Sequence, residues 1–248
     1  MKLYGLIGYP LEHSASPDFF RRKFEEEAIH DADYRLFPLP EICELPRLVA
    51  DHPDMAGFNV TSPFKQAILP YLTRTDNAAA TIGAVNTVKV VRENGRTALN
   101  GYNTDYIGFT ESLMETMPNT PRRALVLGTG GGAKAVRYAL STLHTTVATV
   151  SRTREKGTFI YPELTKEIIQ AHPLIVNATP LGMHPDTVGC PDFPFEWLTV
   201  RHFLYDLIYN PEETEFLRRG RLHGATTCNG LAMLHYQAEA AWNVWQFQ

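Results

Sequence analysis

The chain has 248 residues, 44% of them hydrophobic and 20% charged, with a formal net charge of −4. A chain of this length can bury one large core or two modest ones without disulfides. The small negative charge gives no reason to expect a nucleic acid or an anionic membrane as a partner. Its three cysteines are scattered without metal-ligand spacing, so we expect neither disulfides nor a metal site. Neither a signal-peptide pattern nor an apolar run of transmembrane length is present, so we expect a cytoplasmic protein.

The N-terminal segment predicts a buried strand over residues 2–8 followed by a helix. Pro17 favours the first helical position, and Ser16 before it is typical of an N-cap. The two hydroxyls at this helix start, Ser14 and Ser16, either serve as caps only or hold a substrate carboxylate. The residues alone leave both interpretations open.

Strands and helices alternate along the first hundred residues. Segments 33–38 and 55–61 have strand character and are separated by a helical pattern. Successive β–α units predict an open, mainly parallel sheet, in which ligands bind at the carboxyl ends of the strands. Asn59, Thr61 and Lys65 lie at the end of the third strand. Lys65 is therefore either an acid–base residue or an ordinary surface lysine.

A hairpin is predicted after these units. The Asn94-Gly95 pair, between two strand-like segments, is a strong signal for a two-residue β-turn. Asn86 lies near the start of the first strand of this hairpin, and Asp105 follows the second strand at the start of a helix. Asp105 either caps that helix or supplies a carboxylate to the same region as Lys65.

The most informative local pattern lies near the middle of the chain, where an apolar strand runs into a glycine cluster and a helix. It matches G-x-G-x-x-A, with Gly128, Gly130 and Ala133 at the defining positions. The first glycine permits a tight turn, the second lets the backbone approach a pyrophosphate, and the alanine lets the helix pack closely. Helix N-termini also favour phosphate. The pattern predicts dinucleotide binding, with an ordinary glycine-rich turn as the alternative.

The residues after the next strand indicate which dinucleotide would bind. About 20 residues beyond the glycines, an NAD-dependent enzyme usually has an acidic residue for the ribose 2′-hydroxyl. Here the sequence is Ser151-Arg-Thr-Arg154, with no acid and two arginines. Because arginine binds phosphate in a bidentate manner, this segment favours NADP. A pair of exposed surface arginines is the alternative.

The last third continues the alternation. Strands are expected at 173–177 and 203–209, and Pro211 is expected to begin a helix. The last helix is expected to have Asn229 as its cap and carries apolar residues at helical spacing. Those apolar residues are predicted core positions.

Several segments resemble, in order and spacing, the signature segments of the shikimate dehydrogenase family, and together they cover nearly the whole chain. In the first half they are Ser14-Ala-Ser16, Asn59-Val-Thr-Ser-Pro-Phe-Lys65, Gly83-Ala-Val-Asn-Thr87 and Gly101-Tyr-Asn-Thr-Asp-Tyr-Ile-Gly108. In the second half they are Gly128-Thr-Gly-Gly-Gly132, Ser151-Arg-Thr153, Asn177-Ala-Thr-Pro-Leu-Gly-Met183, Tyr205-Asp-Leu-Ile-Tyr-Asn-Pro211 and Asn229-Gly-Leu-Ala-Met-Leu-His-Tyr-Gln237.

This resemblance implies an α/β fold with two domains and an active site in the cleft between them. Residues 1–102 would form an open, mainly parallel sheet that binds substrate, and residues 103–228 a Rossmann-like NADP-binding domain. The C-terminal helix, 229–248, would pack back on the first domain. The implied reaction is the NADP-dependent, reversible reduction of 3-dehydroshikimate to shikimate.

The resemblance also assigns roles to individual residues. Lys65 and Asp105 match the catalytic pair, in which the lysine exchanges a proton with the substrate and the aspartate favours the charged lysine. The matches to substrate ligands are Ser14, Ser16, Asn59, Thr61, Asn86, Tyr209 and Gln237. The matches to cofactor contacts are Asp76, Gly128, Gly130, Gly131, Gly132, Ala133, Ser151, Arg152, Thr153, Arg154, Thr179, Met183, Leu207 and Gly230.

The chain departs from the family pattern directly after Arg154. Family members generally have a full helix and a further strand there, whereas this chain is short, so we expect a trimmed βα unit. Three alternative functions remain open: an enzyme that also oxidises quinate, a non-catalytic sensor of a shikimate-pathway metabolite, and another two-domain NADP dehydrogenase such as the methylenetetrahydrofolate type. We expect a monomer or a homodimer.

Overall fold

The computed structural model describes residues 1–12 and 14–247. Its chain divides into two compact units. The first comprises residues 1–104 and 237–248, and the second comprises residues 105–236. Among the described residues, no helix combines the length and apolar character needed to cross a bilayer.

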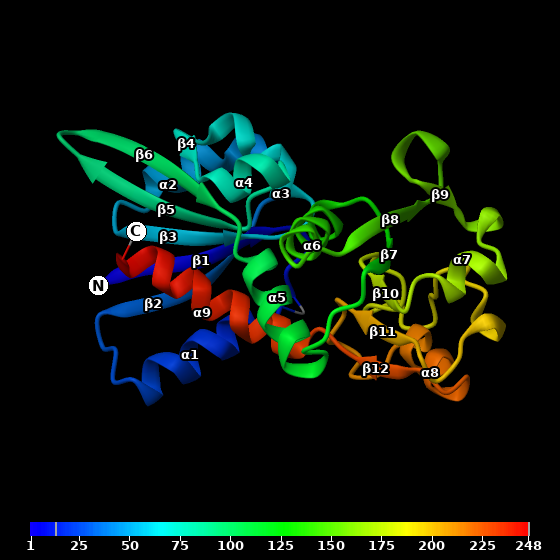
Figure 1. Ribbon diagram of the computed structural model, residues 1–248. Helices are drawn as coiled ribbons and strands as arrows, with labels where there is room; N and C mark the ends of the chain where they lie inside the picture. Colours follow the sequence, from blue (N-terminus) through cyan, green and yellow to red (C-terminus); the bar gives the residue numbers. More distant parts are fainter. Residues whose placement is uncertain (13, 248) are drawn as a thin grey trace. The chain divides into compact units, whose positions relative to one another are not determined.

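The first unit is built on a six-stranded sheet in the order β2-β1-β3-β5-β6-β4 (Figure 1). Its strands are β1 (Lys2–Gly8), β2 (Ala32–Pro38), β3 (Met55–Val60), β4 (Arg74–Thr75), β5 (Thr87–Glu93) and β6 (Arg96–Tyr102). Strand β1 pairs parallel with β2 and β3, as the β–α alternation predicts. The β5–β6 hairpin is antiparallel, and its turn has positive φ at Asn94 (51°) and Gly95 (71°), as a type I′ turn requires.

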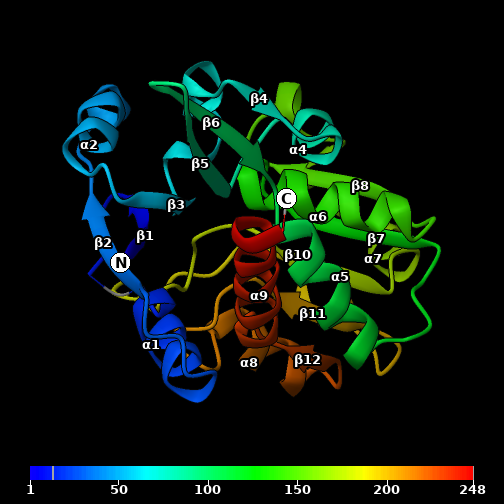
Figure 2. The same ribbon diagram turned by 90° about the vertical axis from the view of Figure 1, so that its left-hand side faces the viewer.

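Helices cover both faces of this sheet, because side chains on β1 alternate between two cores. Tyr4 and Leu6 pack in one buried cluster with residues of α1 and α9, whereas Ile7 packs in a second cluster with residues of α2, α3 and α4 (Figure 2). The helices are α1 (Ser16–Glu26), α2 (Leu45–Asp51), α3 (Phe64–Ala67), α4 (Asn77–Ile82) and α9 (Leu231–Phe247), with short 3₁₀ helices η1 (Ile42–Glu44) and η2 (Leu69–Tyr71).

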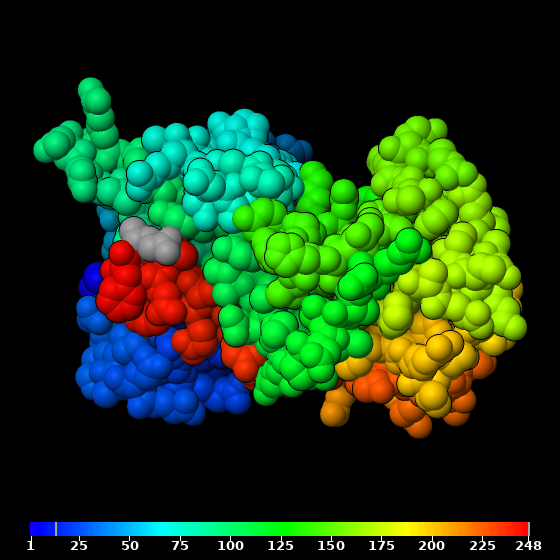
Figure 3. All heavy atoms as spheres, viewed as in Figure 1, coloured from blue at the N-terminus to red at the C-terminus, as the bar shows by residue number. Residues whose placement is uncertain are grey.

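The C-terminal part of α9 belongs to the first unit, which confirms the expected return of the last helix. Trp245 is buried there and stacks on Tyr4, with ring centroids 4.7 Å apart. Lys23 of α1 also forms an ion pair of 2.6 Å with Glu239 of α9. In the space-filling view, the end of α9 lies at the surface beside the N-terminal elements (Figure 3).

The second unit contains a six-stranded, entirely parallel sheet in the order β12-β11-β10-β7-β8-β9. Its strands are β7 (Arg123–Leu127), β8 (Thr146–Ser151), β9 (Phe159–Ile160), β10 (Leu174–Asn177), β11 (Phe203–Asp206) and β12 (Thr226–Cys228). Its helices are α5 (Asp105–Thr116), α6 (Gly131–Thr142), α7 (Lys166–Gln170) and α8 (Glu215–Leu222), with 3₁₀ helices η3 (Arg154–Lys156), η4 (Tyr161–Glu163) and η5 (Phe195–Trp197). Buried clusters lie on both faces of the sheet, as in a doubly wound nucleotide-binding fold.

The segment after β8 agrees with the expected trimming of one βα unit. A single 3₁₀ turn, η3, stands where a helix would follow β8, and β9 consists of two residues only. β9 still pairs parallel with β8. The shortened unit therefore keeps its strand in the parallel sheet but has only a 3₁₀ turn in place of the helix that would follow β8.

Two expected helix starts are wrong. Helix α1 begins at Ser16 with Ala15 at the N-cap, and the side chain that accepts there is Ser14, whose Oγ lies 3.3 Å from the Ser16 amide nitrogen. Pro211 lies outside α8, which begins at Glu215. The Thr214 hydroxyl accepts the Leu217 N–H at 3.3 Å, so this cap, and not the proline, sets the start of the helix.

Candidate active site

A buried polar cluster lies at one end of the sheet in the first unit. Asn59 occupies the end of β3, next to Thr87 at the start of the antiparallel strand β5. Its Nδ2 donates to Thr87 Oγ1 at 3.2 Å and to the Asn86 carbonyl at 3.3 Å. Tyr34 of β2 donates from its hydroxyl to Asn59 Oδ1 at 2.9 Å. This end of the sheet therefore presents hydrogen-bonding groups from three strands within an apolar surrounding.

Asn86 extends the cluster to the C-terminal helix. Its Nδ2 donates to Thr104 Oγ1 at 2.9 Å and to Gln237 Oε1 at 3.2 Å. Its Oδ1 accepts the Thr104 N–H at 2.6 Å. Residues 151 positions apart thus meet here, and three of the predicted substrate ligands, Asn59, Asn86 and Gln237, belong to one hydrogen-bonded network.

The other predicted residues of the first unit lie on the segments next to this network. Thr61 follows β3 and donates its N–H to the Ile7 carbonyl at 2.9 Å. Lys65 is half-buried in the single turn of α3, and its carbonyl accepts the Val85 N–H at 2.7 Å. This bond ties the lysine-bearing turn to the segment that carries Asn86, so the backbone of Lys65 is fixed relative to the cluster.

The predicted carboxylate pair lies at the start of α1. Ser16 is 8% exposed, and Ser14 is half-buried and accepts the Ser16 N–H. Burial raises the pKa of the Tyr34 phenol, and the Ser16 side chain opposes this effect. Tyr34 therefore keeps its proton and donates to Asn59 at neutral pH.

Three members of this network were missed at the level of sequence. Tyr34, Thr87 and Thr104 are buried, and each binds a predicted ligand directly. In the sequence, Tyr34 is one residue of an alternating strand pattern. Thr87 directly follows Asn86, and Thr104 directly follows Asn103. A signal existed only for the threonines, because both stand inside the segments that carry the resemblance.

The glycine turn of the second unit has the geometry that its pattern predicts. Gly128 follows β7 with a φ of 107°, and a side chain there would meet the Ala178 carbonyl at 2.9 Å. Gly130 is the N-cap of α6, and among the described residues no atom beyond its two chain neighbours lies within 4 Å of the position that its Cβ would take. Ala133 is completely buried against the sheet. The turn thus packs tightly on one side and leaves space beside Gly130 and the first amides of α6.

Three predicted cofactor contacts from distant segments come together beside this turn. A Cβ on Gly132 would lie 3.2 Å from Leu207 Cδ1, and a Cβ on Gly230 would lie 2.1 Å from the Leu207 carbonyl oxygen. Gly230 also donates its N–H to the Ile208 carbonyl at 3.0 Å. Asn229 accepts the Leu231 N–H at 3.1 Å, so it caps α9 as expected.

The two arginines of the segment after β8 have different contacts. Both are exposed, and Arg154 forms an ion pair with Glu163 and donates to the Thr158 carbonyl at 3.0 Å. Ser151 is buried, and its hydroxyl exchanges hydrogen bonds with the backbone of Thr153. Arg154 therefore holds the shortened segment in this structure.

A fully buried carboxylate organises the loops after β10 and β11. Asp206 accepts hydrogen bonds from Thr214 Oγ1 at 2.6 Å, Asn177 Nδ2 at 3.1 Å and the Ile208 N–H at 3.1 Å. Burial raises its pKa to about 6, against the opposing effect of these three donors. Asn177 Oδ1 in turn accepts from the Thr179 hydroxyl at 2.7 Å. Asp206 thus connects the loops that carry the predicted contacts Thr179, Met183, Leu207 and Tyr209.

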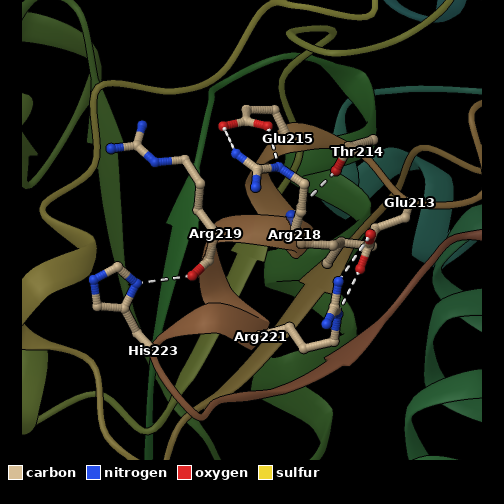
Figure 4. Close-up of polar contacts among 8 residues, drawn as sticks. Glu213, Thr214, Glu215, Arg218, Arg219, Arg221 and His223 are labelled. Atoms are coloured by element: carbon tan, nitrogen blue, oxygen red, sulfur yellow. Dashed lines mark hydrogen bonds and ion pairs between the residues drawn. The ribbon is translucent and has the colours of Figure 1, made fainter.

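The charges on α8 next to these loops are satisfied locally. Arg218 pairs with Glu215 through two hydrogen bonds of 2.7 and 2.8 Å, and Arg221 pairs with Glu213 (Figure 4). Arg219 lies over the Phe195 ring, 4.3 Å from its centroid. These arginines are therefore engaged with their own unit and are poor candidates for a phosphate site.

The two predicted catalytic residues belong to different units. Lys65 lies in the first, and Asp105 is the first residue of α5 in the second, 5% exposed. Asp76, a predicted cofactor contact, is the N-cap of α4 in the first unit and accepts the Ala79 N–H at 2.8 Å. Burial raises the pKa of its carboxyl. The described residues contain no cluster of three or more potential metal ligands.

Comparison with known proteins agrees with these features. Residues 6–88 match the model of the shikimate dehydrogenase substrate-binding domain. Shikimate dehydrogenase (NADP(+)) of Desulforamulus reducens is 39% identical, with 97% of this chain and 88% of that protein covered. The chain belongs to the shikimate dehydrogenase family.

Solved structures of this family share the fold. A shikimate dehydrogenase in complex with NADP+ superposes with a TM-score of 0.89 at 33% identity, covering 99% of this chain and 90% of that one. The Thermus thermophilus shikimate 5-dehydrogenase, in complex with NADP(H) and shikimate, has a TM-score of 0.86 at 31% identity, covering 100% of this chain and 94% of that one. The alignment with the Desulforamulus protein spans 269 positions, whereas this chain has 248 residues. The Desulforamulus protein therefore contains residues that this chain lacks.

As a member of the shikimate dehydrogenase family, the chain retains the features that a dinucleotide needs. The space beside Gly130 suits a pyrophosphate, because any side chain at this position would occupy it. The twelve-residue helix α6 begins at the same point and directs its first N–H groups there. Arg152, exposed directly after β8, is a cation of the type that would hold a 2′-phosphate. The residues present therefore fit NADP.

Proposed function

We propose that this chain catalyses the reversible reduction of 3-dehydroshikimate to shikimate with NADP as cofactor. The observation that carries the proposal is the buried network of Asn59, Asn86 and Gln237 in a chain that matches shikimate dehydrogenases over nearly its full length. Amide side chains in an apolar surrounding are suited to a ligand with several hydroxyl groups, because each can donate and accept. In this proposal Asn59, Thr61, Asn86, Tyr209 and Gln237 bind the ring substituents.

The carboxylate of the substrate is proposed to bind at Ser14 and Ser16. Both hydroxyls can donate to a carboxylate, and the first turn of α1 adds backbone N–H groups of favourable polarity. Ser16 is buried, so an anion held there is partly removed from water and its hydrogen bonds are strengthened.

Lys65 and Asp105 are the proposed catalytic residues. Reduced NADP supplies a hydride to the carbonyl carbon when it is bound. Lys65, as an ammonium, stabilises the negative charge that develops on the carbonyl oxygen and donates the proton. Asp105 favours the charged lysine, so Asp105→Asn should lower turnover. In the reverse direction the neutral amine accepts the proton from the hydroxyl.

The proposed test is a spectrophotometric assay of shikimate with NADP that follows the absorbance of the reduced cofactor. We expect turnover in both directions. The same assay with quinate separates a shikimate-restricted enzyme from a dual one. Shikimate binding by calorimetry without any turnover would instead favour a metabolite sensor built on this fold, and neither binding nor turnover would contradict the proposal.

We further propose that residues 1–102 with 229–248 form the substrate domain, and residues 103–228 the NADP domain. The protein is proposed to act in the cytoplasm as a monomer or a homodimer. Light scattering coupled to size-exclusion chromatography distinguishes the two states, and a larger assembly would contradict this part of the proposal.

A further inference from the structure

Tyr34 is bonded to a proposed substrate ligand without being one itself. Its hydroxyl donates to Asn59 Oδ1 at 2.9 Å, and both side chains are buried. We propose that Tyr34 is a positioning residue that orients the Asn59 carboxamide and thereby sets the affinity for the substrate. This inference rests on the proposed binding role of Asn59.

The direction of each hydrogen bond follows from one group that can only accept. The Asn86 backbone carbonyl faces the Asn59 carboxamide, so the Asn59 NH₂ group must point toward it. The second proton of that NH₂ group goes to Thr87 Oγ1. Asn59 Oδ1 therefore faces Tyr34, which must be the donor. Because both amide protons are used within the protein, Asn59 offers the substrate an acceptor, and the substrate must donate from a hydroxyl.

The Tyr34 ring is held independently of its hydroxyl. It stacks on Phe20 of α1 with ring centroids 4.3 Å apart and an interplanar angle of 16°. It also contacts Trp245 of α9, with a centroid distance of 6.4 Å. Tyr34→Phe removes the hydroxyl and keeps the ring packing. The variant therefore measures the effect of the lost hydrogen bond without a change in core packing.

The test compares Tyr34→Phe with Tyr4→Phe. Tyr4 is 1% exposed in the same core cluster, and its hydroxyl is bonded to Gln246, which is no proposed ligand. The dissociation constant for shikimate is measured by calorimetry without cofactor, and KM and kcat are measured in the assay. We expect Tyr34→Phe to weaken binding by about 3- to 10-fold, the usual effect of one lost hydrogen bond, with KM raised and kcat unchanged. Tyr4→Phe should bind shikimate like the unmodified protein.

A double-mutant cycle with Asn59→Ala separates this inference from the function on which it rests. If Asn59→Ala leaves shikimate binding unchanged, the proposed role of Asn59 fails. If Asn59→Ala weakens binding but Tyr34→Phe does not, the role of Tyr34 alone is overturned. We expect less than additive losses in the double variant, because both changes remove one interaction. Incorporation of 3-fluorotyrosine at position 34 keeps the hydroxyl and should preserve the affinity for shikimate. If this protein bound shikimate as weakly as Tyr34→Phe does, the inference would be overturned.

Discussion

Arg154 forms an ion pair with Glu163 across the shortened segment that follows β8. The Glu163 carboxylate also accepts the Ile160 N–H at 3.0 Å, so it connects the arginine to the strand β9. In a chain that has lost most of one βα unit, this pair joins the two ends of the remaining segment. Both arginines predicted to bind a 2′-phosphate are exposed, and Arg154 is the one that is engaged with a glutamate.

A first prediction separates these two arginines. We expect Arg152→Ala to lower kcat/KM for NADP by about 10- to 100-fold and to leave kcat/KM for NAD unchanged, because one charge-assisted phosphate contact is lost. Arg154→Ala should affect both cofactors alike and lower the melting temperature slightly, since exposed ion pairs contribute little to stability. A selective loss of NADP in Arg154→Ala would mean that Arg154 leaves Glu163 to bind the phosphate.

A second prediction concerns the catalytic lysine. Lys65→Ala should lower kcat by about 10²- to 10⁴-fold, the usual contribution of a positioned proton donor, while calorimetric binding of shikimate changes little. Lys166→Ala, at an exposed position on α7, is the matched control and should retain full activity. An active Lys65→Ala variant would remove this residue from the mechanism.

A third prediction uses the two glycines of the nucleotide-binding turn. Gly130 has a φ of −73° and open space around its missing side chain, so Gly130→Ala should fold normally and bind NADP weakly. Gly128→Ala should instead lower the stability by about 1–3 kcal/mol, because its φ of 107° is strained for alanine and the Ala178 carbonyl is in the way. Thermal melting and calorimetric titration with NADP distinguish the two effects. Unchanged NADP affinity in Gly130→Ala would place the pyrophosphate elsewhere.

A fourth prediction concerns the pH dependence of stability. Burial raises the pKa of Asp206 from its ordinary value of 3.8 to about 6, so the folded state binds a proton more tightly than the unfolded state. The stabilising contribution is complete below about pH 4 and is lost as the pH rises through about 6. It amounts to at most about 3 kcal/mol, because each pKa unit corresponds to about 1.4 kcal/mol.

The measurement is the free energy of unfolding by urea between pH 4 and 7, for the unmodified protein and for Asp206→Asn. We expect the difference between the two curves to change across this range, because asparagine does not titrate. Glu213 and Glu215 have lowered pKa values beside their arginine partners and contribute with the opposite sign, but equally in both proteins. Parallel curves would show that Asp206 does not titrate in this window.

The amino-acid sequence by itself determined those features that depend on neighbouring residues. Alternating apolar segments indicated the strands and helices of both units, and Asn94-Gly95 indicated the hairpin, because its turn requires two positive φ angles. The glycine turn was likewise readable, since the backbone itself requires Gly128, which has a positive φ and lies against the Ala178 carbonyl. The resemblance located Asn59, Asn86 and Gln237, which the structure brings into one network.

Only the tertiary structure decided which side chains share a partner. Tyr34 lies 25 positions before Asn59, and nothing in the alternation of its strand distinguishes it from its neighbours. Asp206 accepts a hydrogen bond from Asn177, 29 positions before it, and Arg154 is bonded to a glutamate nine positions away. The start of α8 was misplaced for a different reason, because the local cap Thr214, rather than Pro211, sets the first turn of the helix. Hydrogen bonds between distant segments leave no local pattern in a sequence, so they become visible only when the chain is folded.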